Sequence, residues 1–146
     1  RPVVTIDYGF VGDVQTVNGA SLSKLIHMDV IPVMAPLTHD GNGQMLNTNA
    51  DTIAGETAKA LADYFDVSLV YCFEKKGVLR NADDEESVIP EITHDDFVQY
   101  VQQGVIQGGM IPKLENAFSA INAGVKQVII TSAEALGQHQ GTVIKG

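Results

Sequence analysis

The sequence VSLVYCF, residues 67–73, is an almost continuous run of apolar residues near the middle of the chain. It follows a segment rich in alanine in which Ile53, Thr57, Leu61 and Phe65 recur at every fourth position. That spacing predicts an amphipathic helix whose small residues allow close packing on a sheet. A short apolar run without alternation is typical of a strand buried on both faces. Together the two segments predict a helix followed by a central strand.

Further helices and strands are predicted on both sides of this unit. In chain order they are a hairpin at residues 3–17, a short helix after Asn18, a strand at 30–36, a hairpin at 79–92 with an acidic tip, helices after Thr93 and at 110–122, a strand at 126–132, a short helix rich in alanine and leucine, and a strand at 141–144. The alternation of helices and buried strands predicts the α/β class, as a three-layer αβα sandwich with an open, mainly parallel sheet and added β-hairpins. We expect residues 1–146 to form a single domain.

Local signals mark the ends of several helices. Asn18 has the side chain of an N-cap residue. Thr93 is followed three positions later by Asp96, the arrangement of a capping box. Gly124 follows the helical segment 110–122, as glycine commonly does at helix C-termini.

The composition is that of a globular domain with an acidic surface. The chain has 146 residues, of which 45% are hydrophobic and 18% charged, and its formal net charge is -9. This charge argues against a nucleic-acid-binding surface, and no apolar run approaches the roughly 18 residues of a membrane span. The single cysteine, Cys72, allows no internal disulfide, which favours a cytoplasmic protein. Its apolar neighbours predict a buried, inert thiol.

The first candidate site is NTNAD, residues 47–51, between a Gly/Asp-rich turn and the alanine-rich helix. If this segment is extended, Asn47, Asn49 and Asp51 point to the same side. A calcium loop starting at Asp40 is excluded, because its sixth position would be Met45 instead of glycine. Asp51 alone is explained equally well as a helix cap. The two asparagines are harder to explain in this way, because a cap needs one acceptor.

The second candidate site is QGGMIPK, residues 107–113, at the start of a predicted helix. Gly108 and Gly109 would let the backbone approach a ligand, and the free N–H groups of a helix N-terminus attract anions. Lys113 lies at this positive helix end, where it is unfavourable unless an anion binds there. The alternative interpretation is a flexible glycine pair followed by a solvated lysine.

The third candidate site is FEKKGVL, residues 73–79, which follows the central strand. In open α/β sheets, ligands bind beyond the carboxyl ends of the strands. From charge alone, Lys75 and Lys76 are interpreted as a solvated turn, and the acidic tip at residues 83–86 as a solvated loop. The four histidines do not have the spacing of metal ligands, and we expect no protein-held metal.

The three segments MLNTNAD, FEKKGVL and QGGMIPK, in this order, resemble the C-terminal half of the amino acid kinase family, and most closely its acylglutamate kinases. Matching segments extend over nearly the whole chain: GFVGDV, IPVMAP, NTNADTIAG, GGMIPK and GTVI. The combination of NTNAD and GGMIPK is fairly specific to the acylglutamate kinases. The resemblance implies transfer of the γ-phosphate of ATP to the side-chain carboxylate of N-acetylglutamate, a step of arginine biosynthesis.

The resemblance also implies roles for individual residues. Asn47, with Asn49 beside it, would bind the acylated amino acid, Asp51 would orient catalytic lysines, and Lys113 would stabilise the transferring phosphoryl group. The residues that would border the nucleotide are Glu74, Lys75, Lys76, Gly77, Val78, Leu79, Val105, Ile106, Gln107, Gly108, Gly109 and Met110. ATP would enter with Mg²⁺ held mainly through its phosphates, and the full-length protein would form a homo-oligomer. The expected partners are small molecules, with no nucleic acid and no membrane.

Two features depart from the family pattern, and two alternatives stay open. Glu74 stands where the family usually has aspartate, and no glycine-flanked lysine of the family's N-terminal half precedes Arg1. The chain is therefore expected to be the C-terminal, nucleotide-binding portion of a larger kinase, inactive by itself. The acceptor could instead be N-succinylglutamate or another substrate of the family. In the second alternative, the chain is a non-catalytic α/β module that binds a nucleotide or a protein partner.

Overall fold

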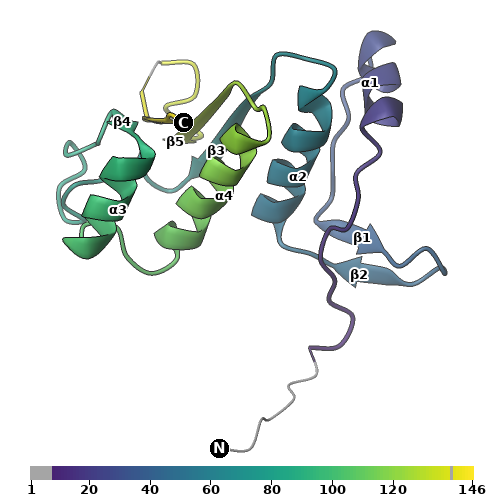
Figure 1. Cartoon of the computed structure of the whole chain (residues 1–146), viewed down its shortest axis with the longest axis horizontal. Coiled ribbons are helices and arrows are strands. Elements are labelled where there is room, and N and C mark those ends of the chain that lie inside the picture. Colours follow the sequence, from purple (N-terminus) through teal and green to yellow (C-terminus); the bar gives the residue numbers. More distant parts are fainter. Residues whose placement is uncertain (1–7, 139) are drawn as a thin grey trace, which may run out of the picture.

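A computed structural model describes residues 8–138 and 140–146, so the expected strand at residues 3–6 lies outside the described part of the chain. Figure 1 shows the arrangement of the helices and strands. In chain order these are α1 (Gly19–His27), β1 (Leu37–His39), β2 (Met45–Asn47), α2 (Ala50–Ala62), β3 (Ser68–Phe73), β4 (Glu91–Ile92), α3 (His94–Gln102), α4 (Met110–Asn122), β5 (Gln127–Ser132) and β6 (Thr142–Ile144).

Four of the strands form one sheet in the order β3-β5-β6-β4. The pairs β3–β5 and β4–β6 are parallel, and β5–β6 is antiparallel. In the long parallel pair, Tyr71 lies beside Ile130 and Phe73 beside Ser132. The strands β1 and β2 form a separate antiparallel hairpin. The predicted α/β class with a mainly parallel sheet is confirmed, whereas the hairpin of β1 and β2 was not among the predicted elements.

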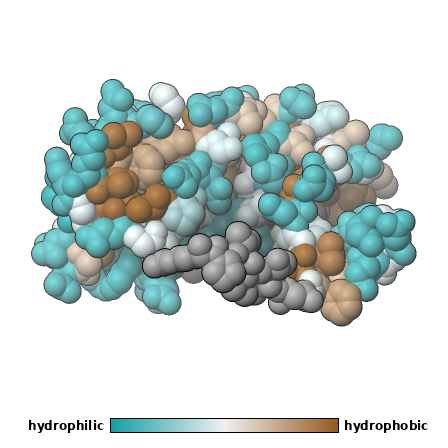
Figure 2. Space-filling model, turned by 60° about the horizontal axis from the view of Figure 1, so that its bottom comes forward, coloured by the Kyte–Doolittle hydropathy of each residue, from teal (hydrophilic) through white to brown (hydrophobic). Residues whose placement is uncertain are grey.

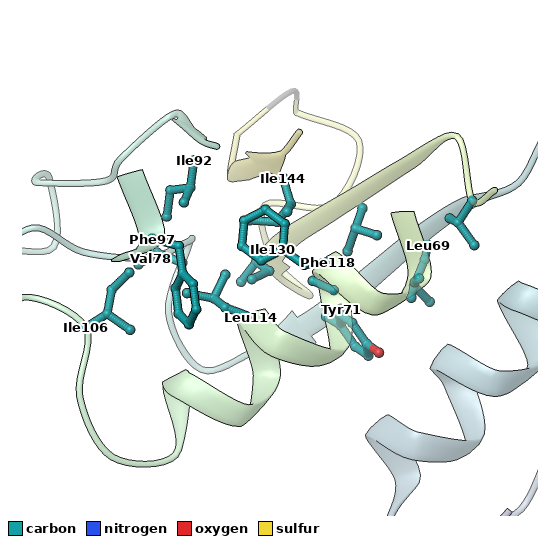
Figure 3. Packing of buried hydrophobic residues seen from close by; sticks show 14 of the residues in the cluster. Leu69, Tyr71, Val78, Ile92, Phe97, Ile106, Leu114, Phe118, Ile130 and Ile144 are labelled. Carbon is teal, nitrogen blue, oxygen red and sulfur yellow. The ribbon is translucent and has the colours of Figure 1, made fainter. Parts of the chain in front are cut away.

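The hydrophobic core lies between one face of this sheet and the helices α2, α3 and α4 (Figure 1). Leu69 and Tyr71 of β3, Ile130 of β5 and Ile144 of β6 belong to this core together with Phe118 of α4 (Figure 3). Burial of these side chains is the main stabilising contribution to such a core, at about 25 cal/mol per Å² of apolar surface. The core fixes α2 and α4 side by side on the sheet.

The opposite face of the sheet is exposed at β3 in the described part of the chain. Residues alternate in β3, so that Leu69 and Tyr71 are buried while Val70 and Cys72 are exposed. The predictions of a strand buried on both faces and of a buried thiol are therefore wrong for the described residues. The physical reason is that the helices that contact this sheet pack on its other face, and a second helical layer is not among the described elements.

The predicted helix ends agree with the structure. The Asn18 side chain accepts a hydrogen bond from the amide of Ser21 at the start of α1. Thr93 and Asp96 form both hydrogen bonds of the capping box of α3. Gly124 has a φ of +96° just after α4, a conformation that costs glycine little and other residues more.

Three predicted elements differ from the structure. Residues 11–17 and 30–36 contain no strand, and the segment after Ser132 forms turns instead of a short helix. Within residues 30–36, Ile31 and Val33 are 87% and 93% exposed. Pro32 and Pro36 lack the N–H groups of a sheet ladder, and within the described residues no neighbouring strand pairs with this segment.

No described helix has both the length and the apolar character needed to cross a membrane.

Candidate active site

Asp51 and Lys113 meet at the N-terminal ends of two neighbouring helices. Asp51 lies in the first turn of α2, and Lys113 is the fourth residue of α4. Lys113 Nζ donates to Asp51 Oδ2 over 2.7 Å, and the two side chains are only 29% and 28% exposed. Side chains on a helix tilt toward its N-terminus, so both groups reach the end of the helix pair where backbone N–H groups are free.

The three polar residues of NTNAD have separate environments. Asn49 is the N-cap of α2, since its Oδ1 accepts hydrogen bonds from the amides of Asp51 and Thr52. The alternative interpretation, in which Asp51 caps this helix, is therefore excluded. Asn47 ends β2, and its side chain is exposed without a hydrogen-bond partner among the described residues. The chain turns into helix at Ala50, so only Asn47 and Asn49 lie on an extended segment.

An aromatic ring that the sequence analysis did not identify lies against the catalytic lysine candidate. Lys113 Nζ is 3.7 Å from the centroid of the Phe73 ring, a cation–π contact. The Phe73 ring stacks on Tyr71 at 5.9 Å, and the Tyr71 hydroxyl donates to the backbone carbonyl of Asp51 over 3.1 Å. Burial, followed by the negative charges of Asp51 and Glu56, raises the pKa of Tyr71 to about 12, so the hydroxyl remains a donor. Phe73 has no sequence signal of its own, because it ends an apolar strand.

The glycine pair before α4 exposes backbone donors. Gly108 has a φ of +56°, and a methyl group added at either Gly108 or Gly109 would meet no atom within 4 Å. Within the described residues, the amides of Gly108 and Gly109 donate no hydrogen bond, and α4 has no side-chain cap. The N-terminus of this helix is thus open toward an anion, with the Lys113 side chain tilted toward it.

Two adjoining hollows lie beyond the carboxyl end of β3. One has a volume of about 500 Å³ and is lined by Cys72, Phe73, Glu74, Lys75, Gly77, Met110 and Lys113. The other has a volume of about 560 Å³ and is lined by Lys75, Gly77, Val78, Leu79, Arg80, Asn81, Ala82, Gly104, Val105, Ile106, Gln107 and Met110. The hollows share Lys75, Gly77 and Met110. In Figure 2, hydrophobic side chains surrounded by hydrophilic ones gather on the side of the molecule where α3 lies.

Most residues predicted to border a nucleotide line these hollows. Lys76, Gly108 and Gly109 do not line them, although Gly108 and Gly109 directly precede Met110, which does. The hollows also contain Arg80, which the sequence analysis missed; its guanidinium lies 5.4 Å from the Tyr100 ring centroid and donates to the Tyr100 hydroxyl. The sequence signal that could have identified Arg80 is its position directly after the FEKKGVL segment.

The acidic tip of the hairpin folds back onto the two lysines. Lys75 pairs with Glu85 at 2.6 Å, and Lys76 with Glu86 at 3.3 Å. The hydrogen bond from Lys75 holds the pKa of the Glu85 carboxyl below its usual value. All four side chains are exposed, so these pairs contribute little to stability. The tip is solvated, as predicted, but it also lies next to a cation that lines both hollows.

A buried threonine fixes the loop that follows β3. The Thr142 hydroxyl accepts a hydrogen bond from the amide of Val78 over 2.8 Å and donates to the carbonyl of Ile89 over 2.6 Å. Gly77 fits against the same residue, because a Cβ there would lie 2.8 Å from Thr142 Oγ1.

The described residues contain no group of three or more His, Cys, Asp or Glu side chains that could hold a metal ion.

Comparison with known proteins places this geometry in a family. The family model described as "Amino acid kinase family" matches residues 2–132. The chain belongs to the amino acid kinase family. Among curated members similar to this chain, the acetylglutamate kinase of Phocaeicola vulgatus is 69% identical over 145 residues, and that of Bacteroides thetaiotaomicron is 70% identical over the same length. Each match covers 99% of this chain and 56% of the relative.

The fold is also similar to that of a solved structure. A crystal structure from Streptococcus mutans has a TM-score of 0.77 at 38% identity, covering 94% of this chain and 52% of that chain. The chain therefore spans about half the length of the relatives that it matches. The NTNAD segment and the GGMIPK helix start both lie within the residues that the family model matches.

Proposed function

We propose that the chain is the nucleotide-binding portion of an acylglutamate kinase, which transfers the γ-phosphate of ATP to the side-chain carboxylate of N-acetyl-L-glutamate. The observation that carries the proposal is the ion pair between Lys113 and Asp51, beside the free amides of Gly108 and Gly109. The proposal is further supported by the acetylglutamate kinases of Phocaeicola and Bacteroides, to which the chain is similar.

The proposed reaction needs no general base. A glutamate side chain has a reference pKa of about 4.3 and is already ionised at neutral pH. A carboxylate oxygen attacks the γ-phosphorus while the bond from that phosphorus to the β,γ-bridging oxygen breaks, which yields an acyl phosphate and ADP. No proton moves in this step. This chemistry fits a site that is formed by a lysine, a carboxylate and backbone amides.

The main obstacle is the approach of one anion to another. Lys113 and the Gly108 and Gly109 amides supply the positive potential that such a transfer requires. Asp51 balances the Lys113 charge and fixes the direction of the ammonium group. The two hollows beyond β3 offer space for the nucleoside, with Lys75 between them near the phosphates. Mg²⁺ would then arrive with ATP and be held mainly by the phosphates.

Asn47 and Asn49 are proposed to face the acylated amino acid. The side-chain amide of Asn47 is exposed and has no hydrogen-bond partner among the described residues, so it is available to a ligand. Asn49 already uses its Oδ1 as the α2 cap, which leaves its amide nitrogen as the available donor. An N-succinyl acceptor stays an alternative, since nothing in the described residues distinguishes the two acyl groups.

The proposal is tested with the full-length protein and with the chain alone. We expect the full-length protein, given MgATP and N-acetylglutamate, to form an acyl phosphate that hydroxylamine traps. N-Succinylglutamate and glutamate, assayed in parallel, would identify the acceptor. Titration calorimetry of residues 1–146 with MgADP is expected to show weak binding without turnover. If no acceptor yields product while MgADP still binds, the chain is a nucleotide-binding module and the kinase proposal is rejected.

A further inference from the structure

The ammonium group of Lys113 is held between a carboxylate and an aromatic face that come from different elements. Asp51 Oδ2 lies 2.7 Å from Nζ, and the centroid of the Phe73 ring lies 3.7 Å from it. Asp51 belongs to α2 and Phe73 to the last position of β3. A lysine side chain has four flexible carbons and does not keep its position without such contacts.

The Phe73 ring is itself held in place by the same network. It stacks on Tyr71 with an interplanar angle of 12°, and Tyr71 is only 4% exposed. The Tyr71 hydroxyl donates to the Asp51 carbonyl, so one buried residue supports both the ring and the turn that carries the carboxylate. Gly55 is close to this contact, because a Cβ there would lie 3.1 Å from the Tyr71 hydroxyl oxygen.

The two contacts have different consequences for the lysine. An ammonium group has three N–H donors, and Asp51 accepts one of them. The face of an aromatic ring attracts a cation through its quadrupole, but it offers no lone pair that competes for a specific donor. Phe73 therefore stabilises the lysine position while donors remain available to phosphoryl oxygens. The ring also lines the 500 Å³ hollow together with Lys113.

We infer that Phe73 is a positioning residue for Lys113, which holds the ammonium group at the phosphoryl-transfer position through the contact between Nζ and the ring face. This inference rests on the proposed function and extends it to a residue with no polar group. It assigns Phe73 an effect on phosphoryl transfer and none on nucleotide affinity.

The first test compares Phe73→Leu with Phe73→Tyr in the full-length enzyme. Leucine keeps an apolar side chain and removes the ring, whereas tyrosine keeps the ring face. We expect Phe73→Leu to lower kcat by about 5- to 30-fold, the range of a cation–π contact in a partly desolvated site, with the KM for ATP changed by less than about threefold. Phe73→Tyr should recover most of kcat. Phe65→Leu is the matched control, since Phe65 is also half-buried and its ring lies against His27, at 5.3 Å between ring centroids, and not against Lys113.

The second test separates positioning of the lysine from a purely structural role. In a Lys113→Met background, Phe73→Leu should cause no further loss of kcat, because the group that the ring positions has been removed. An equal loss in both backgrounds would overturn the inference. A raised KM for ATP with kcat unchanged would also overturn it, and would instead identify Phe73 as a nucleotide contact.

A third measurement does not depend on the kinase activity. Reductive ¹³C-methylation keeps the lysine charge, and the Lys113 signal, assigned with a Lys113→Arg variant, should be shifted upfield by the ring. The shift should vanish in Phe73→Leu and persist in Phe65→Leu. If wild type shows no upfield shift, the contact does not form and the inference fails, whatever the enzyme phosphorylates. If the shift is present but no acceptor is phosphorylated, only the proposed function fails.

Discussion

Lys113 and Asp51 are separated by 62 positions in the sequence, yet their side chains form a 2.7 Å ion pair. The pair joins the first turns of α2 and α4, which lie side by side on the same face of the sheet (Figure 1). A lysine at a helix N-terminus and an aspartate in a first turn have opposite effects on helix stability, because the helix dipole disfavours the cation and favours the anion. Their contact offsets part of the cost of the misplaced lysine and leaves it close to free backbone donors.

Replacing Lys113 should affect the chemical step more than nucleotide binding. We expect Lys113→Ala in the full-length enzyme to lower kcat by about 10²- to 10³-fold, as for other donors that meet developing charge, with a much smaller change in the KM for ATP. Steady-state kinetics with trapped acyl phosphate provides the measurement. Lys126→Ala is the matched control, since Lys126 also forms a 2.7 Å ion pair, with Asp66. An unchanged kcat for Lys113→Ala would remove this lysine from the mechanism.

Replacing Asp51 tests whether the carboxylate directs the lysine. Asp51→Asn keeps the shape of the side chain and removes the charge that pairs with Lys113. We expect kcat to fall by at least about tenfold, because an ammonium without its partner adopts other positions and one partly buried charge is left unpaired. Asp66→Asn removes a carboxylate from an exposed ion pair and should leave kcat unchanged. Similar kinetics for both variants would show that Asp51 is only a surface charge.

The acidic tip should compete with ATP for Lys75. Glu85 holds Lys75 at 2.6 Å, so Glu85→Gln frees a cation that lines both hollows. We expect the Kd for MgATP to decrease by up to about fivefold, the scale of an exposed ion pair. Glu86→Gln is the control, because it removes the same charge from the same loop but pairs with Lys76, which does not line the hollows. Equal effects in calorimetry would indicate a general charge effect instead of competition for Lys75.

The buried hydroxyl of Thr142 should be important for stability. Thr142→Val removes the partner of the Val78 amide and of the Ile89 carbonyl, which are both buried. We expect the free energy of unfolding of the chain to decrease by about 1–3 kcal/mol, the cost of unsatisfied buried groups. Urea denaturation measures the change. Thr142→Ser keeps the hydroxyl and should lose clearly less, whereas a Thr142→Val variant as stable as the wild type would contradict the prediction.

The capping box of α3 should weaken in acid. Hydrogen bonds from the Thr93 hydroxyl and amide hold the pKa of the Asp96 carboxyl below its ordinary 3.8. A carboxyl group with a lowered folded-state pKa stabilises the fold above its unfolded pKa, and this contribution is lost as the pH falls through the folded value. We therefore expect part of the acid dependence of stability below pH 3.8 to disappear in Asp96→Asn and to persist in Asp95→Asn. An NMR titration that places Asp96 at or above 3.8 would contradict the prediction.

The elements that the sequence predicted well depend on residues a few positions apart. The capping box of Thr93 and Asp96, the Asn18 cap and the Gly124 terminus all involve contacts within one helical turn. Helix α4 begins and ends where the sequence indicated, at Met110 and Asn122, because a glycine pair precedes it and a glycine follows it. Such signals are local, so the chain carries them without reference to its tertiary structure.

The predictions that failed depend on which elements pack against each other. An apolar run such as VSLVYCF does not show whether a second layer covers its other face, and Cys72 is exposed because the described helices pack on the face of Leu69 and Tyr71. Similarly, the apolar residues of VIPVMAP favour a strand, but a strand needs a partner that supplies hydrogen bonds. No described strand does so.

The sequence by itself determined the α/β class and the positions of the major helices, because these follow from periodicity and capping residues. Only the tertiary structure decided that Lys113 meets Asp51 and that Phe73 lies against the ammonium group. These contacts join α2, β3 and α4 across long stretches of chain. Their geometry is set by how the helices pack on the sheet, which no local pattern encodes.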